Sequence, residues 1–149
     1  MYYFNALSKR KKNEWKAQRI MVSDKVKILI VEDEGIQAMA LEETLGFLGY
    51  EVVGVVDNGK DALEMVSRGS IDLVILDVHI KGNLDGIETA KRILEIDRIA
   101  IVYLTAFMDN FTQDRAESTN PAAYLTKPYR DSALQNAIEL ALVASGESN

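Results

Sequence analysis

The sequence contains no cysteine and only one histidine, His79, among its 149 residues. Without cysteine there are no disulfides, no thiolate chemistry and no zinc site built on sulfur, and an oxidising compartment is disfavoured. One histidine cannot build a polyhistidine metal site. No apolar run approaches the ~20 residues of a membrane-spanning helix, and the start of the chain lacks the apolar core of a signal peptide. We therefore expect a cytoplasmic protein of one domain, without a membrane span.

Positive charge is scarce after the first 25 residues. That first segment holds seven Lys/Arg and two acids, which gives it a net charge of +5. The rest of the chain has a net charge of −11, so the whole chain has a net charge of −6. The acidic body argues against nucleic acid as a direct partner and suits a site for a divalent cation. We expect residues 1–24 to form a disordered basic tail, with a helical arm for an acidic partner or membrane surface as the alternative. Met21 is a second candidate for the natural start.

Strand-like and helix-like segments alternate from residue 25 to residue 145. Short apolar runs rich in β-branched residues predict strands at 26–31, 51–56, 71–76, 99–104 and 122–125. Helical spacing of apolar residues predicts helices at 36–48, 58–69, 87–96, 110–118 and 131–144. Asn58 is the expected N-cap of the second helix, and Gly49 and Gly69 are expected to end the first two. Residues 146–149 are left as a short C-terminal tail.

Five successive βα units predict one parallel sheet covered by helices on both faces. For five strands we expect the flavodoxin-like, doubly wound order 2-1-3-4-5, with five helices and a crevice between the first and third strands. The first helix is expected to bury the apolar positions of one face, namely Ile36, Met39, Ala40, Leu45 and Leu48.

Polar residues follow four of the predicted strands. Asp77 follows the third strand, Glu32-Asp33 the first, Thr105 the fourth and Lys127-Pro128 the fifth. The carboxyl ends of parallel strands lie at one edge of the sheet, where ligands bind in open α/β folds. We therefore expect acids, a hydroxyl and an amine to converge on Asp77.

These groups predict phosphoryl chemistry. Three carboxylates within a few ångströms repel one another unless a cation lies among them, and Mg²⁺ suits oxygen ligands. A carboxylate beside Mg²⁺ is a known phosphoryl acceptor. Lys127 would supply positive charge and Thr105 a hydrogen bond to the transferring group. The small Ala106 would leave the acceptor reachable by a donor.

Together with Asp85-Gly86 and Tyr124, these residues closely resemble the receiver domain of two-component response regulators. The resemblance covers about residues 26–145. It implies that Asp77 accepts a phosphoryl group from the phosphohistidine of a sensor kinase. It also implies that Asp33, Asp77 and the main-chain carbonyl of His79 ligate Mg²⁺, with Glu32 acting through a bound water.

The same resemblance implies how the signal is transmitted. Lys127 would contact the phosphoryl oxygens, and Thr105 would move to hydrogen-bond them. Tyr124 would turn inward as the switch aromatic, and the Lys127–Pro128 bond would be cis. The added charge of about −2 would shift a two-state equilibrium of the face formed by the fourth helix, fifth strand and fifth helix.

One segment departs from the family pattern. The stretch from Asp77 to Gly86 is one residue longer than the commonest version, with residues 81–83 reading Lys-Gly-Asn where a proline is usual. Because the extra residue follows His79, we expect the metal ligands to be kept and the loop shape to differ.

Other classes of function fit less well. A phosphohydrolase of the haloacid dehalogenase type would need an Asp-x-Asp pair after its first strand, and no glycine-rich phosphate loop follows any predicted strand. A pseudo-receiver that binds partners without phosphorylation remains the alternative. We expect a phosphorylated switch, not a turnover enzyme, whose partners are a sensor kinase or phosphotransfer protein and a downstream protein. A homodimer would use the face defined above, near Tyr124 and Arg130.

Overall fold

The strands form a single parallel sheet in the computed structural model, which describes residues 25–147 and side chains as far as residue 145. They are β1 (Lys27–Val31), β2 (Glu51–Val56), β3 (Leu73–Asp77), β4 (Ala100–Thr105) and β5 (Ala123–Thr126). The order is β2-β1-β3-β4-β5, which confirms the predicted topology. The predicted basic tail, residues 1–24, and residues 148–149 lie outside the described range.

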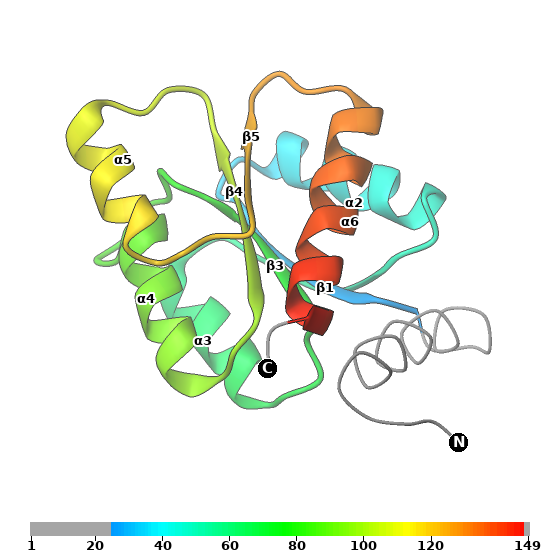
Figure 1. The fold of residues 1–149 in the computed structure, drawn as a ribbon, viewed down its shortest axis with the longest axis horizontal. Coiled ribbons are helices and arrows are strands. Elements are labelled where there is room, and N and C mark those ends of the chain that lie inside the picture. The colour runs from blue at the N-terminus through cyan, green and yellow to red at the C-terminus, as the bar shows by residue number, and fades with distance from the viewer. Residues whose placement is uncertain (1–24, 148–149) are drawn as a thin grey trace.

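The helices cover both faces of this sheet (Figure 1). They are α2 (Gly35–Phe47), α3 (Gly59–Ser67), α4 (Gly86–Ile96), α5 (Asn110–Glu117) and α6 (Asp131–Glu147). The pair α2 and α6 packs on one face, and α3, α4 and α5 pack on the other. This arrangement confirms the flavodoxin-like, doubly wound class. Within the described range, no helix is long and apolar enough to cross a membrane.

The sheet separates two hydrophobic cores. Side chains alternate between the faces of a strand, so Val74 and Leu76 of β3 join the core under α3, α4 and α5. Leu73 and Ile75 join the core under α2 and α6. All residues of β3 are buried because both of its faces are covered.

Local signals set most helix ends where they were predicted. The Asn58 side chain accepts a hydrogen bond from the Asp61 N–H at 2.9 Å and begins α3. Gly49 and Gly69 follow α2 and α3 with φ of +97° and +83°, a left-handed conformation that glycine adopts without a Cβ clash. The predicted end of the last helix is wrong, because α6 continues past Ala144 to Glu147 and takes in part of the predicted C-terminal tail.

The predicted core face of α2 is largely wrong. Ile36 and Met39 are 86% and 70% exposed, and Ala40 is also exposed. Leu45 is buried as expected and Leu48 is partly buried, but the other core positions of this helix are Ala38 and Leu41. Apolar residues lie on several sides of α2, so their spacing in the sequence is compatible with more than one buried face.

Candidate functional site at the carboxyl edge of the sheet

The pairing of β1 with β3 places two predicted acids side by side. The strands are parallel and in register up to Val31 and Leu76. The residues that follow, Glu32 and Asp77, therefore leave the sheet at the same level, and both are buried. One oxygen of Asp77, Oδ1, accepts a hydrogen bond from the main-chain N–H of His79 at 2.8 Å.

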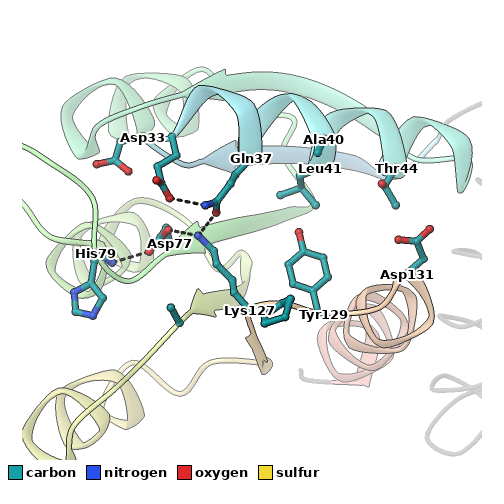
Figure 2. A pocket seen from close by; sticks show the side chains of 13 residues that line it. Asp33, Gln37, Ala40, Leu41, Thr44, Asp77, His79, Lys127, Tyr129 and Asp131 are labelled. Carbon is teal, nitrogen blue, oxygen red and sulfur yellow. Dashed lines mark hydrogen bonds and ion pairs between the residues drawn. The ribbon is translucent and has the colours of Figure 1, made fainter.

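The Lys127 ammonium lies among three oxygen acceptors. Figure 2 shows its contacts with Asp77 and Gln37. The ammonium is 2.6 Å from Asp77 Oδ2, 2.7 Å from Glu32 Oε2 and 2.6 Å from Gln37 Oε1. The Lys127 main-chain N–H donates to the Thr105 carbonyl at 2.8 Å, which holds the lysine at the end of β4. Burial disfavours the charged ammonium, but its hydrogen bonds to Asp77 and Glu32 outweigh this and raise the pKa of Lys127. The lysine is therefore charged at neutral pH. The Lys127–Pro128 bond is cis, as the resemblance implied.

The three carboxylates of Glu32, Asp33 and Asp77 do not form the close cluster that was predicted. In the described part of the chain, no three acidic or histidine side chains form a cluster that could hold a metal ion. The Lys127 ammonium instead bridges Glu32 and Asp77, and it supplies the positive charge that these acids need. Burial raises the pKa of Glu32, and hydrogen bonds from Lys127 and from the Glu34 N–H offset part of that rise.

The three residues expected to supply oxygen ligands to Mg²⁺ nevertheless line one cavity. Asp33, Asp77 and His79 all line it (Figure 2). Asp33 Oδ2 accepts the Lys81 N–H at 3.0 Å, so the lengthened loop after β3 contacts this carboxylate directly. Two carboxylates and a main-chain carbonyl, completed by water, make a hard donor set of the kind that Mg²⁺ prefers. The residues present therefore fit the ion, with Asp33 and Asp77 as the acids that would ligate it directly.

The cavity has a volume of about 850 Å³ and extends from Asp77 along α2 toward the start of α6. Its far half is lined by residues that the sequence analysis did not identify, among them Leu41, Thr44, Tyr129 and Asp131. Gln37 was also missed. It lies in the first turn of the helix that begins just after Glu32-Asp33, and this position was the available signal, because that turn begins at the same edge of the sheet.

The predicted switch hydroxyl is engaged away from Asp77. Thr105 is buried at the end of β4, and its hydroxyl donates to the Phe107 carbonyl at 2.9 Å. His79 Nε2 lies 3.2 Å from the same carbonyl. Ala106 lines the cavity, as expected for a small residue beside the acceptor. The Phe107 carbonyl thus ties the loop after β4 to Thr105 and to His79.

The predicted switch aromatic, Tyr124, connects β5 to α5. Its ring stacks on that of Tyr103, with centroids 5.8 Å apart and an interplanar angle of 27°. Its hydroxyl donates to Glu117 Oε2 at 3.0 Å. Burial and the Glu117 carboxylate raise the pKa of Tyr124 to about 12. Tyr103 is a fully buried core residue whose hydroxyl lies 2.8 Å from Thr119 Oγ1.

Asp85 has two structural roles that the sequence did not reveal. Its Oδ1 accepts the Glu88 N–H at 2.8 Å and so caps α4. Its carboxylate also binds the guanidinium of Arg115 in α5, at 2.9 and 3.2 Å. Next to it, a Cβ at position 86 would overlap the Asp77 carbonyl oxygen, which explains the glycine in the Asp85-Gly86 motif.

Comparisons with known proteins agree on one family. A sequence model of the response regulator receiver domain matches residues 28–139. The transcriptional regulatory protein PdtaR of Mycobacterium tuberculosis is 41% identical over 116 residues, which are 78% of this chain and 56% of that protein. The chain spans about half the length of the curated relatives it matches.

Solved receiver domains share the fold. That of a modulated diguanylate cyclase from Desulfovibrio desulfuricans superposes with a TM-score of 0.78 at 36% identity, over 83% of this chain and 98% of that one. The receiver domain of the sensor histidine kinase PA1611 from Pseudomonas aeruginosa has a TM-score of 0.71 at 26% identity, over 79% and 98% of the two chains. That structure holds a magnesium ion coordinated in its active-site cleft.

Receiver domains of this kind act through kinases and partner proteins and are not typical turnover enzymes. The fold, the strand-end residues and the sequence match lead to one assignment. The chain belongs to the response regulator receiver family of two-component signal transduction.

Proposed function

We propose that Asp77 accepts a phosphoryl group from the phosphohistidine of a sensor histidine kinase or phosphotransfer protein. The observation that carries this proposal is the Lys127 ammonium, 2.6 Å from the Asp77 carboxylate at an open cavity. A carboxylate that a donor can approach supplies the acceptor, and a lysine beside it supplies positive charge for the transferring group.

The transfer balances without any further reactant. An Asp77 carboxylate oxygen forms a bond to phosphorus while the bond from phosphorus to the donor imidazole nitrogen breaks. That nitrogen keeps the electron pair and takes a proton from solvent, and Asp77 carries an acyl phosphate. Water later attacks phosphorus, which releases inorganic phosphate and restores the carboxylate. The chain thus promotes its own phosphorylation and dephosphorylation and turns over no separate substrate.

In this proposal the transfer depends on Mg²⁺. Asp33, Asp77 and the main-chain carbonyl of His79 would hold the ion, and Glu32 would act through a bound water. When bound, the ion supplies positive charge against the phosphoryl oxygens. The hard oxygen donors that line the cavity support this assignment.

The remaining residues respond to the new charge. Lys127 exchanges its contact with the Asp77 carboxylate for one with a phosphoryl oxygen. Thr105 exchanges the Phe107 carbonyl for another phosphoryl oxygen, and Ala106 leaves room for the group. Tyr124 then turns inward. Each exchange favours the phosphorylated conformation, so together they shift the population of two states.

The output passes to a downstream protein through α5, β5 and α6. This surface includes Tyr124 and Arg130, and it is also where we place a homodimer contact. Residues 25–145 form the receiver unit in this proposal, and the chain works in the cytoplasm. The −11 charge after residue 25 favours protein over nucleic acid as its direct partner.

Intact mass after incubation with Mg²⁺ and a small acyl-phosphate donor tests the acceptor. We expect one phosphoryl adduct on the native protein, none without Mg²⁺ and none on Asp77→Asn. Asp114→Asn, the same change on an exposed position of α5, should form the adduct normally.

The other outcomes separate the alternatives. A folded native protein that forms no adduct would favour the phosphorylation-independent pseudo-receiver. An adduct that persists on Asp77→Asn would show that another side chain is the acceptor.

A further inference from the structure

Gln37 contacts the Lys127 ammonium at the site, although it is not among the residues assigned above to phosphoryl transfer. Its Oε1 lies 2.6 Å from the Lys127 ammonium (Figure 2). Its Nε2 donates to Glu34 Oε1 at 2.6 Å. An ammonium can only donate and a carboxylate can only accept. The two neighbours therefore set the orientation of the amide, with its oxygen toward Lys127.

Glu32 and Gln37 hold the ammonium from different sides. Glu32 is 2% exposed and lies beneath the cavity, outside its lining. Gln37 is exposed and lines the cavity through which a donor must approach. The bond to Glu32 thus draws the ammonium toward the protein interior, and the bond to Gln37 draws it toward the cavity.

This difference becomes important when Asp77 is phosphorylated. As the carboxylate oxygen bonds to phosphorus, the negative charge of Asp77 passes to the phosphoryl oxygens, so the Lys127–Asp77 bond weakens. Of the two acceptors that remain, Glu32 alone would draw the ammonium away from the transferring group. Gln37 opposes this and keeps the ammonium beside the phosphoryl oxygens, where the charge develops.

We propose that Gln37 is a positioning residue, which holds the Lys127 ammonium on the cavity side for phosphoryl transfer to Asp77. This inference rests on the proposed function and adds a residue to it. Gln37 itself contacts neither the phosphoryl group nor the donor; it acts through Lys127.

Gln37→Met removes the acceptor and keeps the length and helix propensity of the side chain. We expect the rate of adduct formation at saturating small acyl-phosphate donor to fall about fivefold, with the half-saturating donor concentration unchanged. Gln113→Met is the matched control, because Gln113 is an exposed helical glutamine on α5. Its rate should equal that of the native protein.

Two further measurements separate positioning from a general structural effect. In a Lys127→Met background, Gln37→Met should produce no further decrease, because the residue through which it acts is gone. Without donor or Mg²⁺, the NMR signal of the Lys127 ammonium protons should be visible in the native protein and lost or broadened in Gln37→Met, since one hydrogen bond no longer slows their exchange.

The outcomes distinguish this inference from the proposed function. Equal adduct rates for Gln37→Met and the native protein would overturn the positioning role and leave Asp77 as acceptor. The positioning role would also be overturned if Gln37→Met lowered the adduct rate by the same factor in the Lys127→Met background as in the native protein. If neither the native protein nor Gln113→Met forms an adduct, the proposed function itself fails, and the positioning role fails with it.

Discussion

At the scale of residues, the ion pairs of Lys127 organise the site. The lysine is separated by 95 positions from Glu32 and by 50 from Asp77, yet it forms an ion pair with each of them. Two carboxylates that share a buried site without a cation would raise each other's pKa and lose stability. The lysine therefore offsets part of the repulsion between the two acids before any phosphoryl group arrives.

Replacing this lysine should expose the cost of the buried acids. For Lys127→Met we expect a loss of about 2 kcal/mol in the free energy of unfolding at pH 7, less than for a fully buried pair because the lysine side chain is 17% exposed. The folded-state pKa of Glu32 already lies above its ordinary 4.5 and should rise further. A raised carboxyl pKa favours the folded state on protonation, so part of the loss should be recovered as the pH falls from 7 toward 4.5.

Urea unfolding at a series of pH values measures this effect. Lys60→Met, at an exposed position of α3, is the control and should change little at any pH. A Lys127→Met deficit that is the same at pH 7 and pH 5 would show that Glu32 does not cause it.

At the scale of elements, α5 is attached to the molecule by few contacts. Only Ala116 of this helix is fully buried. Side chains outside the core therefore hold it: Arg115 binds Asp85 at the start of α4, and Glu117 accepts the hydroxyl of Tyr124 in β5. Because the Glu117 contact joins α5 to the residue proposed as the switch, α5 is suited to shift with it.

Asp85→Asn should loosen α5 selectively, because asparagine still caps α4 but no longer pairs with Arg115. We expect a loss of about 1 kcal/mol at pH 7, a modest value because the Asp85 and Arg115 side chains are 39% and 29% exposed. Burial opposes ionisation of Asp85, but Arg115 and the Glu88 N–H outweigh it and hold its pKa below 3.8. A lowered carboxyl pKa contributes stability above pH 3.8, and this contribution is lost as the pH falls through the folded-state pKa.

Hydrogen exchange by NMR locates the effect. The amides of α5 should exchange faster in Asp85→Asn, whereas those of α3 should not change. Asp109→Asn is the control, because Asp109 caps α5 through the Thr112 N–H at 2.7 Å and asparagine keeps that cap. Equal exchange of α5 in Asp85→Asn and the native protein would show that the Arg115 pair does not hold the helix.

At the scale of the whole molecule, β3 joins the two cores. Neighbouring residues of this strand pack in opposite directions, Ile75 against α2 and α6, and Leu76 against α3, α4 and α5. If β3 separated from the sheet, both cores would be disrupted at once. The two layers should therefore unfold as one unit.

Ile75→Ala and Leu76→Ala test this coupling from either side of the sheet. Each should lower the free energy of unfolding by about 2–5 kcal/mol, because it leaves a cavity in a fully buried core. Far-UV circular dichroism and tyrosine fluorescence should report the same single transition in urea for both variants. Leu140→Ala, on the exposed side of α6, should change stability by less than about 0.5 kcal/mol. Two separate transitions in either variant would contradict the coupling.

The sequence by itself determined the class of the fold and the strand ends that carry the polar residues Glu32, Asp33, Asp77, Thr105 and Lys127. Apolar runs such as residues 71–76 mark the central strands, and the helices between them require parallel connections. The polar residues after each run must then lie at one edge. The motif residues therefore identified the receiver family before any contact was known.

Only the tertiary structure decided which of these groups touch. The spacing of apolar residues did not define the buried side of α2, because Ile36 and Met39 are apolar yet exposed. That Lys127 binds Glu32, Asp77 and Gln37 depends on side-chain directions in four separate segments of the chain. A pattern along the chain reports local period and average burial. The partners of a charge depend instead on how distant segments pack, and packing is a property of the whole molecule.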